Sequence, residues 1–467
     1  MRKLLFFVFL VGISFEMLGQ SVISGNEPGY AGVELVFKTQ KDPFVETDSV
    51  LAKCTVAANG DFSAILPIKE ITNVYTDLGI YRGFIYVEPN SKYVVSFPTK
   101  TDRSEADKLN PFFSEIHFQF SIKDLKNTDL NFLMLAFDDA YLPYFSKFAN
   151  NKYKRNTKAL VDSAIIDLRK IEKYSQNPYF LSFVEYKVGF LRHLAYQQKS
   201  KSISKEYFQS KPILYNNTAY IDLFNQVYSR YFYFFGRTLV GKPISDDINI
   251  FKSYSKLTST LKTDSVLLND TLRELVILKN IHDEFYSDNY SRSGLINILD
   301  SLMQFTKLNL HKEYAVIIKN KLTRLMPGFA PPAFSLFDND SVLVNLSDYK
   351  GKYVYLNFCV CNSYACIKEF DVLKNLLEKY KDKFAIITIA SDDTRESMSV
   401  FAKKSGYNWK FLHYGNQPDI LEKYDIRAFP TYFLIGPNGK LIYSPAVSPG
   451  ENFELYLFQV MRARGDV

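Results

Sequence analysis

Apolar and polar positions alternate along the first hundred residues. In DSVLAKCTVAANGDFSAIL, residues 48–66, every second side chain before the Asn59-Gly60 dipeptide is apolar or small, and the alternation resumes after it. Asn-Gly between two such runs is typical of a tight hairpin turn. The inward positions of the first run are Val50, Ala52, Cys54 and Val56. The pattern predicts an antiparallel β-sandwich over residues 20–107.

The apolar period changes to that of a helix between residues 108 and 325. In GLINILDSLMQF, residues 294–305, apolar side chains recur at i, i+3, i+4 and i+7, which is the spacing of one helix face. These positions are Leu295, Ile298, Leu299 and Leu302. Glycine and proline are sparse here, so helices are able to run long. We expect a central all-α region.

The last third of the chain alternates between the two patterns. The proline-rich MPGFAPPAF, residues 326–334, separates it from the helical region. The apolar strands YVYLNF and FAIITIA flank a helical CIKEFDVLKNLLEKY, and an Asn438-Gly439 hairpin and a final helix follow. Strands and helices in alternation indicate an α/β domain over residues 326–467.

The first nineteen residues have the composition of a secretory signal peptide. Arg2 and Lys3 precede an apolar run from Leu4 to Val11, and a small Gly19 follows. The apolar run is too short to span a bilayer, and no cysteine follows it as in a lipoprotein. No later stretch is apolar for long enough to cross a membrane. The sequence therefore predicts export to the periplasm or cell envelope.

Charge and composition narrow the classes of partner. The formal charge of +7 is mild for 467 residues, and no basic cluster is interleaved with aromatic side chains. We therefore expect no nucleic-acid partner. The sequence indicates no cofactor, and the oligomeric state stays open.

Three of the four cysteines lie in NFCVCNSYACIKEF, residues 357–370. An exported chain meets oxidising conditions, but four cysteines are too few for a framework of disulfide bonds that would stabilise a chain of this length. Three thiols within eight residues point instead to a local site.

A known family is visible around this cluster. LSDYKGKYVYLNF, the KEF of the following helix, AFPTYFLI and GPNGKL occur in that order between residues 346 and 441. Together they resemble the secreted bacterial thioredoxin-like disulfide reductases of the TlpA/ResA type. The resemblance implies a thioredoxin-like fold for residues 326–467. The preceding regions resemble the N-terminal extension of multidomain Bacteroidetes-type members.

The resemblance breaks at the catalytic motif. Family members carry Trp-Cys-x-x-Cys, and an ungapped alignment puts Asn362 at the tryptophan, Ser363 at the first cysteine and Cys366 at the second. The first cysteine is the family's nucleophile, and a serine hydroxyl forms no mixed disulfide. Ser363 is expected to cap the helix instead. Cys366 shares a helix face with Phe370, so its thiol should point inward.

Other family features are retained. The resemblance implies that Glu369 assists proton movement near the recessed thiol. It also implies that Phe429 and Pro430 form a cis-proline loop that binds an extended protein or peptide partner. A retained docking loop beside a missing nucleophile favours binding over turnover.

Three interpretations follow for the cysteine cluster. The leading one is a partner-binding or structural module without conventional reductase activity. The alternative is a thiol-disulfide oxidoreductase that uses Cys361 and Cys366, five residues apart across a strand-to-helix corner that a turn could close. A bond between Cys359 and Cys361 is disfavoured, because their side chains run parallel on an extended strand. A soft-metal site ranks third, since no histidine lies nearby in the sequence.

Overall fold

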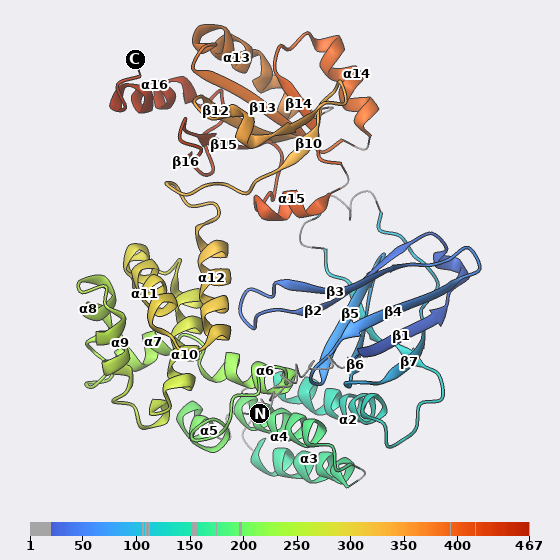
Figure 1. The fold of residues 1–467 in the computed structure, drawn as a ribbon. Helices are drawn as coiled ribbons and strands as arrows, with labels where there is room; N and C mark the ends of the chain where they lie inside the picture. Colours follow the sequence, from blue (N-terminus) through green and yellow to red (C-terminus); the bar gives the residue numbers. More distant parts are fainter. Residues whose placement is uncertain are drawn as a thin grey trace, which may run out of the picture. The chain divides into compact units, whose positions relative to one another are not determined.

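The computed structural model describes most of the chain. The described residues are 20–104, 107, 110, 113–150, 157–173, 175–195, 199–361, 363–392, 394–415 and 417–466. The predicted signal peptide and Asn362 lie outside them. The chain divides into two compact units, Met1–Thr101 with Ile116–Tyr228 and Asp102–Glu115 with Ser229–Val467 (Figure 1).

The first unit contains two β-sheets. Their orders are β3-β2-β5-β6-β8 and β4-β1-β7-β9. The strands are β1 Gln20–Asn26, β2 Glu34–Gln40, β3 Asp48–Thr55, β4 Asp61–Pro67, β5 Thr72–Leu78, β6 Tyr81–Val87, β7 Lys92–Ser96, β8 Ile116–Gln119 and β9 Ser121–Ile122. Apolar side chains from both sheets form one hydrophobic cluster. Burial of this shared cluster holds the two sheets together.

The strand pairing corrects two expectations. Most neighbours are antiparallel, but β1 pairs with β7 and β6 pairs with β8 in parallel, so the sheets are mixed. β8 and β9 also lie beyond residue 107, in the region that we expected to be all helical. Both strands are too short, at four and two residues, to show an alternating pattern in the sequence.

A β-bulge explains why one predicted inward residue is exposed. The pairing of β2 with β3 shifts register between Phe37 and Lys38, so that Phe37 pairs with Ala52 and Lys38 with Val50. A bulge reverses the side-chain alternation from that point. Val50 is accordingly 54% exposed, contrary to expectation, whereas Cys54 is half-buried.

Helices of the central region fall in both compact units. The first unit holds α2 Leu130–Asn150, α3 Thr157–Glu172, α4 Pro178–Leu194, α5 Ser200–Tyr207 and α6 Thr218–Val227. The second holds α7 Tyr231–Gly236, α8 Ile244–Asn249, α9 Tyr254–Leu261, α10 Asp270–Glu284, α11 Arg292–Phe305 and α12 Asn309–Thr323. The predicted apolar face of α11 is buried. Among the described residues, no helix is long and apolar enough to cross a membrane.

The C-terminal domain in the second unit is built on a five-stranded sheet of order β14-β13-β12-β15-β16. Its strands are β12 Tyr353–Cys359, β13 Phe384–Ala390, β14 Lys410–His413, β15 Thr431–Ile435 and β16 Leu441–Tyr443, after a hairpin of β10 Ser335–Phe337 and β11 Leu343–Asn345. Its helices are α13 Tyr364–Tyr380, α14 Arg395–Ser405, α15 Pro418–Lys423 and α16 Phe453–Ala463. β12, β13 and β14 run parallel, whereas β15 and β16 are antiparallel to their neighbours.

The central strand β12 separates two hydrophobic clusters. All seven of its residues are buried, as expected for a strand with helices on both faces. Tyr353, Tyr355 and Cys359 point into the cluster that includes α13, α14 and α16, whereas Val354 and Phe358 point into the cluster that includes α15. The helices accordingly lie on opposite sides of the sheet (Figure 1). This alternation puts Cys359 on the same side as α13.

Candidate functional site

The candidate site lies where the central strand turns into α13. Cys359 is the last residue of β12, Cys361 lies in the turn, Ser363 is the N-cap of α13, and Cys366 is in its first turn. The four cysteines of the chain are free thiols. Cys359, Cys361 and Cys366 are at most 2% exposed and belong to one hydrophobic cluster. The predicted inward direction of Cys366 is confirmed.

The cluster makes the three thiols electrostatically different. Hydrogen bonding from the Cys359 thiol, with further donation from the Val360 N–H and the Ser363 hydroxyl, lowers the pKa of Cys366 to about 7 despite burial. Burial raises the pKa of Cys359 well above its ordinary value, so this thiol stays protonated and is able to donate. Cys366 is therefore the most acidic thiol of the cluster.

Cys361 is held by a carboxylate that the sequence did not reveal. Its backbone N–H donates to both carboxylate oxygens of Asp392, at 3.1 and 3.2 Å. The hydrogen bond with Cys359 favours the Cys361 thiolate, but burial and the negative charge of Asp392 together raise its pKa. The pairing of Cys361 with Cys366 stays a prediction: both are free thiols in this structure, and the hydrogen bond with Cys359 is the largest influence on the pKa of Cys366.

Ser363 does not act as we expected. It is the N-cap residue of α13 with extended backbone angles, but its side chain makes no capping hydrogen bond. Its hydroxyl instead favours the Cys366 thiolate. The Ser363 side chain therefore serves as a donor to the neighbouring thiol.

Glu369 lies one turn after Cys366. Its Oε2 accepts a hydrogen bond of 2.7 Å from the Gly450 N–H. Burial, followed by the charges of Glu369 and of Cys366, raises the pKa of Tyr432. The Tyr432 hydroxyl is buried and, among the described residues, has no hydrogen-bond partner. Tyr432 therefore lies close enough to Glu369 and to the thiol cluster to be affected by the charge of each, a position that the sequence did not indicate.

The register of β15 against β12 brings the Pro430 loop to the thiols. Phe358 pairs with Thr431, so the end of β12 adjoins the start of β15. The Phe429–Pro430 peptide bond is cis, and so is Ser444–Pro445. The Phe429 side chain packs against both hydrophobic clusters of the domain.

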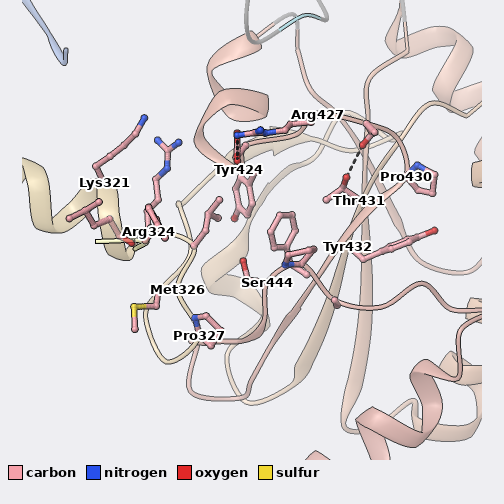
Figure 2. A pocket seen from close by; sticks show the side chains of 18 of the residues that line it. Lys321, Arg324, Met326, Pro327, Tyr424, Arg427, Pro430, Thr431, Tyr432 and Ser444 are labelled. Carbon is pink, nitrogen blue, oxygen red and sulfur yellow. Dashed lines mark hydrogen bonds and ion pairs between the residues drawn. The ribbon is translucent and has the colours of Figure 1, made fainter. Parts of the chain in front are cut away.

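A cavity of about 1020 Å³ adjoins this loop (Figure 2). Pro430, Thr431 and Tyr432 line it, but among the described residues that line it there is no cysteine, Ser363, Glu369 or Phe429. The thiols and the cavity are therefore separate features joined by the start of β15. In the part of the chain that the structure describes, no group of three His, Cys, Asp or Glu side chains is arranged to hold a metal ion.

The Cys366 thiol is expected to ionise with a midpoint near pH 7 in the native protein. Pulses of iodoacetamide from pH 5.5 to 9.5, quantified by peptide mass spectrometry, should show its alkylation rate level off above pH 8. Cys54 is the internal control: burial raises its pKa, so its rate should still be rising at the top of this range. In Ser363→Ala the Cys366 midpoint should move upward, because a donor to the thiolate is lost. A wild-type midpoint at 8.5 or above would contradict this description.

Comparisons with known proteins agree with this architecture. A family model described as Redoxin matches residues 326–455. The thiol-disulfide oxidoreductase ResA of Bacillus cereus is 33% identical over 26% of this chain and 71% of its own length. The chain belongs to the ResA family of thiol-disulfide oxidoreductases.

The match to the family model lies in the C-terminal domain. ResA of Bacillus subtilis is 28% identical over 33% of this chain and 82% of its own length. Among solved structures, the thioredoxin domain of a thiol-disulfide oxidoreductase from Bacteroides vulgatus is 26% identical, covers 29% of this chain and 97% of that one, and has a TM-score of 0.27. The thioredoxin-like character of this domain, expected from the sequence, is confirmed.

Proposed function

We propose that this ResA-family domain serves as a partner-binding or structural module and does not catalyse conventional two-cysteine disulfide exchange. The observation that carries the proposal is Ser363 at the N-cap of α13, where the family alignment places the nucleophilic cysteine. The partner's disulfide would have to be attacked by a thiolate. A serine hydroxyl does not perform that step, and Cys366 behind it is fully buried.

The partner in this proposal is an extended protein or peptide segment beside Pro430. The family resemblance supports this, because the loop before β15 is where such domains receive an extended chain. The cavity next to Pro430 supplies space for it. We further propose that the protein is exported and acts in the periplasm or cell envelope, on the basis of the signal-like residues 1–19. The two N-terminal β-sheets and the helices that follow them would then be extensions of this module.

Wild-type protein is expected to show no insulin-reductase turnover above the dithiothreitol background. The assay follows insulin precipitation, with the isolated ResA-type domain of a two-cysteine relative as the positive control. Peptide mapping of the four cysteines, with alkylation before and after reduction, is performed on the same sample. Turnover at the rate of the positive control would overturn the proposal.

A second function is favoured by the low pKa of Cys366 and by its hydrogen bond with Cys359. In this alternative the Cys366 thiolate attacks a partner disulfide and releases one partner thiolate. Cys359, after losing its proton, attacks the Cys366 sulfur and releases the second. The partner is reduced by two electrons, a Cys359–Cys366 disulfide forms, and an external dithiol must reduce it again. A mapped Cys359–Cys366 disulfide together with turnover would favour this alternative. Loss of turnover in Cys359→Ala would distinguish it from a mechanism in which Cys361 pairs with Cys366.

A further inference from the structure

The cavity beside Pro430 has a wall that the thioredoxin-like domain does not supply. His282 of α10, Arg292 of α11, Lys321 of α12 and Arg324 at the end of α12 line one side. Figure 2 shows Lys321 and Arg324 on this side, and Pro430 and Thr431 across the cavity. All four wall residues precede residue 326, where the family match begins. The helical region thus adds residues to the groove that the family domain lacks.

This helical wall is positively charged. The Arg324 guanidinium donates to the neutral Glu422 carbonyl oxygen at 3.0 Å, and the Arg292 guanidinium lies 5.3 Å from the centre of the Tyr286 ring. Among the described residues, neither arginine has a carboxylate within ion-pair distance. Their charges therefore remain available to an occupant of the cavity.

The opposite wall does not cancel this charge. Its Asp425 carboxylate is engaged by the guanidinium of Arg427, with both contacts at 3.2 Å. Glu451, the other carboxylate that lines the cavity, accepts a hydrogen bond from the Ser448 N–H at 3.4 Å. The described lining thus has four Lys and Arg side chains against two carboxylates. A cavity with this excess attracts anionic groups.

Arginine pairs most specifically with planar anions such as carboxylates, through two parallel N–H donors. A volume of about 1020 Å³ is at or above the upper end of small-ligand pockets. The cavity also extends to Pro430, where the proposed function places a partner chain. These three features together favour an Asp- or Glu-bearing peptide segment over a small free anion.

We propose that the cavity selects an acidic segment of the partner protein, with Arg292 and Arg324 pairing with its carboxylates while its backbone runs past Pro430. This inference rests on the proposed partner-binding function and adds the chemical class of the partner. It also assigns a role to the helices before residue 326: they determine which partner the family domain accepts.

The test measures fluorescence anisotropy of two labelled ten-residue peptides on the full-length protein. One peptide carries four Glu residues and its twin carries Gln at the same positions. The variant Arg292→Gln/Arg324→Gln removes the two unpaired charges, and Lys381→Gln/Lys404→Gln removes two exposed lysines outside the cavity as a charge-matched control. Circular dichroism spectra and thermal melts establish that each variant is folded.

The acidic peptide is expected to bind wild type and the lysine control equally. The dissociation constant of the acidic peptide should be roughly ten-fold higher for the arginine variant than for wild type, because each exposed ion pair contributes modestly and two act together. The Gln peptide should likewise bind wild type roughly ten-fold more weakly than the acidic peptide does. Added salt should weaken the acidic peptide selectively.

Equal binding of the two peptides, or equal binding by the two double variants, would overturn the inference and leave the proposed groove intact. If neither peptide binds, the inference is also overturned. In that case the proposed function is decided separately by whether Ser363→Cys reduces insulin, because that reaction needs a substrate chain beside Pro430 but no charged wall.

Discussion

Replacing Ser363 by cysteine is expected to give the protein the insulin-reductase activity that, in our proposal, the wild type lacks. The substitution creates Cys-Tyr-Ala-Cys at residues 363–366, with the new thiol at the N-cap of a 17-residue helix and the recessed Cys366 three residues on. Partial positive charge at a helix N-terminus stabilises a thiolate there. A cysteine with a pKa near 7 is about half ionised at pH 7, so a large fraction of the variant is ready to attack a disulfide. We expect Ser363→Cys to reduce insulin at least roughly ten-fold faster than the dithiothreitol background, which is the rate expected of the wild type.

Unlike Cys366, Ser363 is only partly buried, so a thiol at this position is open to a substrate disulfide. Ser363→Ala is the matched control: it removes the hydroxyl without adding a thiol and should stay inactive. Ser363→Cys/Cys366→Ser should accumulate a mixed disulfide with the substrate, because the resolving thiol is absent. A folded but inactive Ser363→Cys would mean that the groove no longer admits a substrate chain, and the binding proposal would fail with it.

The parts of the site that are local in sequence were predictable. The strand at 353–358, the helix that follows and the inward direction of Cys366 all follow from short-range periodicity, and each is present. The apolar face of α11 was predictable for the same reason. Such patterns depend on neighbours within two turns, so one sequence is enough to read them.

The parts of the site that depend on long-range pairing were not predictable. Asp392 reaches the Cys361 N–H because β13 pairs with β12, and Tyr432 reaches the thiols because β15 does. These residues lie 31 and 71 positions from Cys361, and no periodicity connects them. Ser363 makes no capping hydrogen bond, and its hydroxyl is oriented toward the Cys366 thiol three residues on, a side-chain contact that helix-capping preferences do not include.

The bulge in β3 and the cationic wall show the same limit. One extra residue in β3 turns Val50 outward, and the alternation of apolar and polar residues from residue 48 onward does not indicate this bulge. Arg292 and Arg324 are ordinary surface positions in their helices, and only the tertiary structure places them on a cavity shared with Pro430. The sequence therefore predicts which face of a helix or strand is buried. It predicts less well which residues of other elements lie opposite its polar face.

Phe370→Ala is expected to lower the free energy of unfolding of the C-terminal domain by about 3–5 kcal/mol, the cost of truncating a fully buried phenylalanine. Phe370 is 0% exposed, one turn after Cys366. Its ring centre lies 5.3 to 6.0 Å from those of four other aromatic side chains: Tyr407, Trp409, Phe411 and Phe401. Aromatic pairs at this spacing add to the energy of burial.

Urea unfolding followed by tryptophan fluorescence measures this effect selectively, because Trp409 is the chain's one tryptophan and packs against Phe370. Val372→Ala, on the same helix and 37% exposed, is the control and should cost about 0.5 kcal/mol or less. Because Phe370 anchors the turn that carries Cys366, its loss should also speed Cys366 alkylation while Cys54 is unaffected. A Phe370→Ala midpoint equal to that of Val372→Ala would show that this aromatic cluster does not hold α13 on the sheet, and the buried state of Cys366 would need another cause.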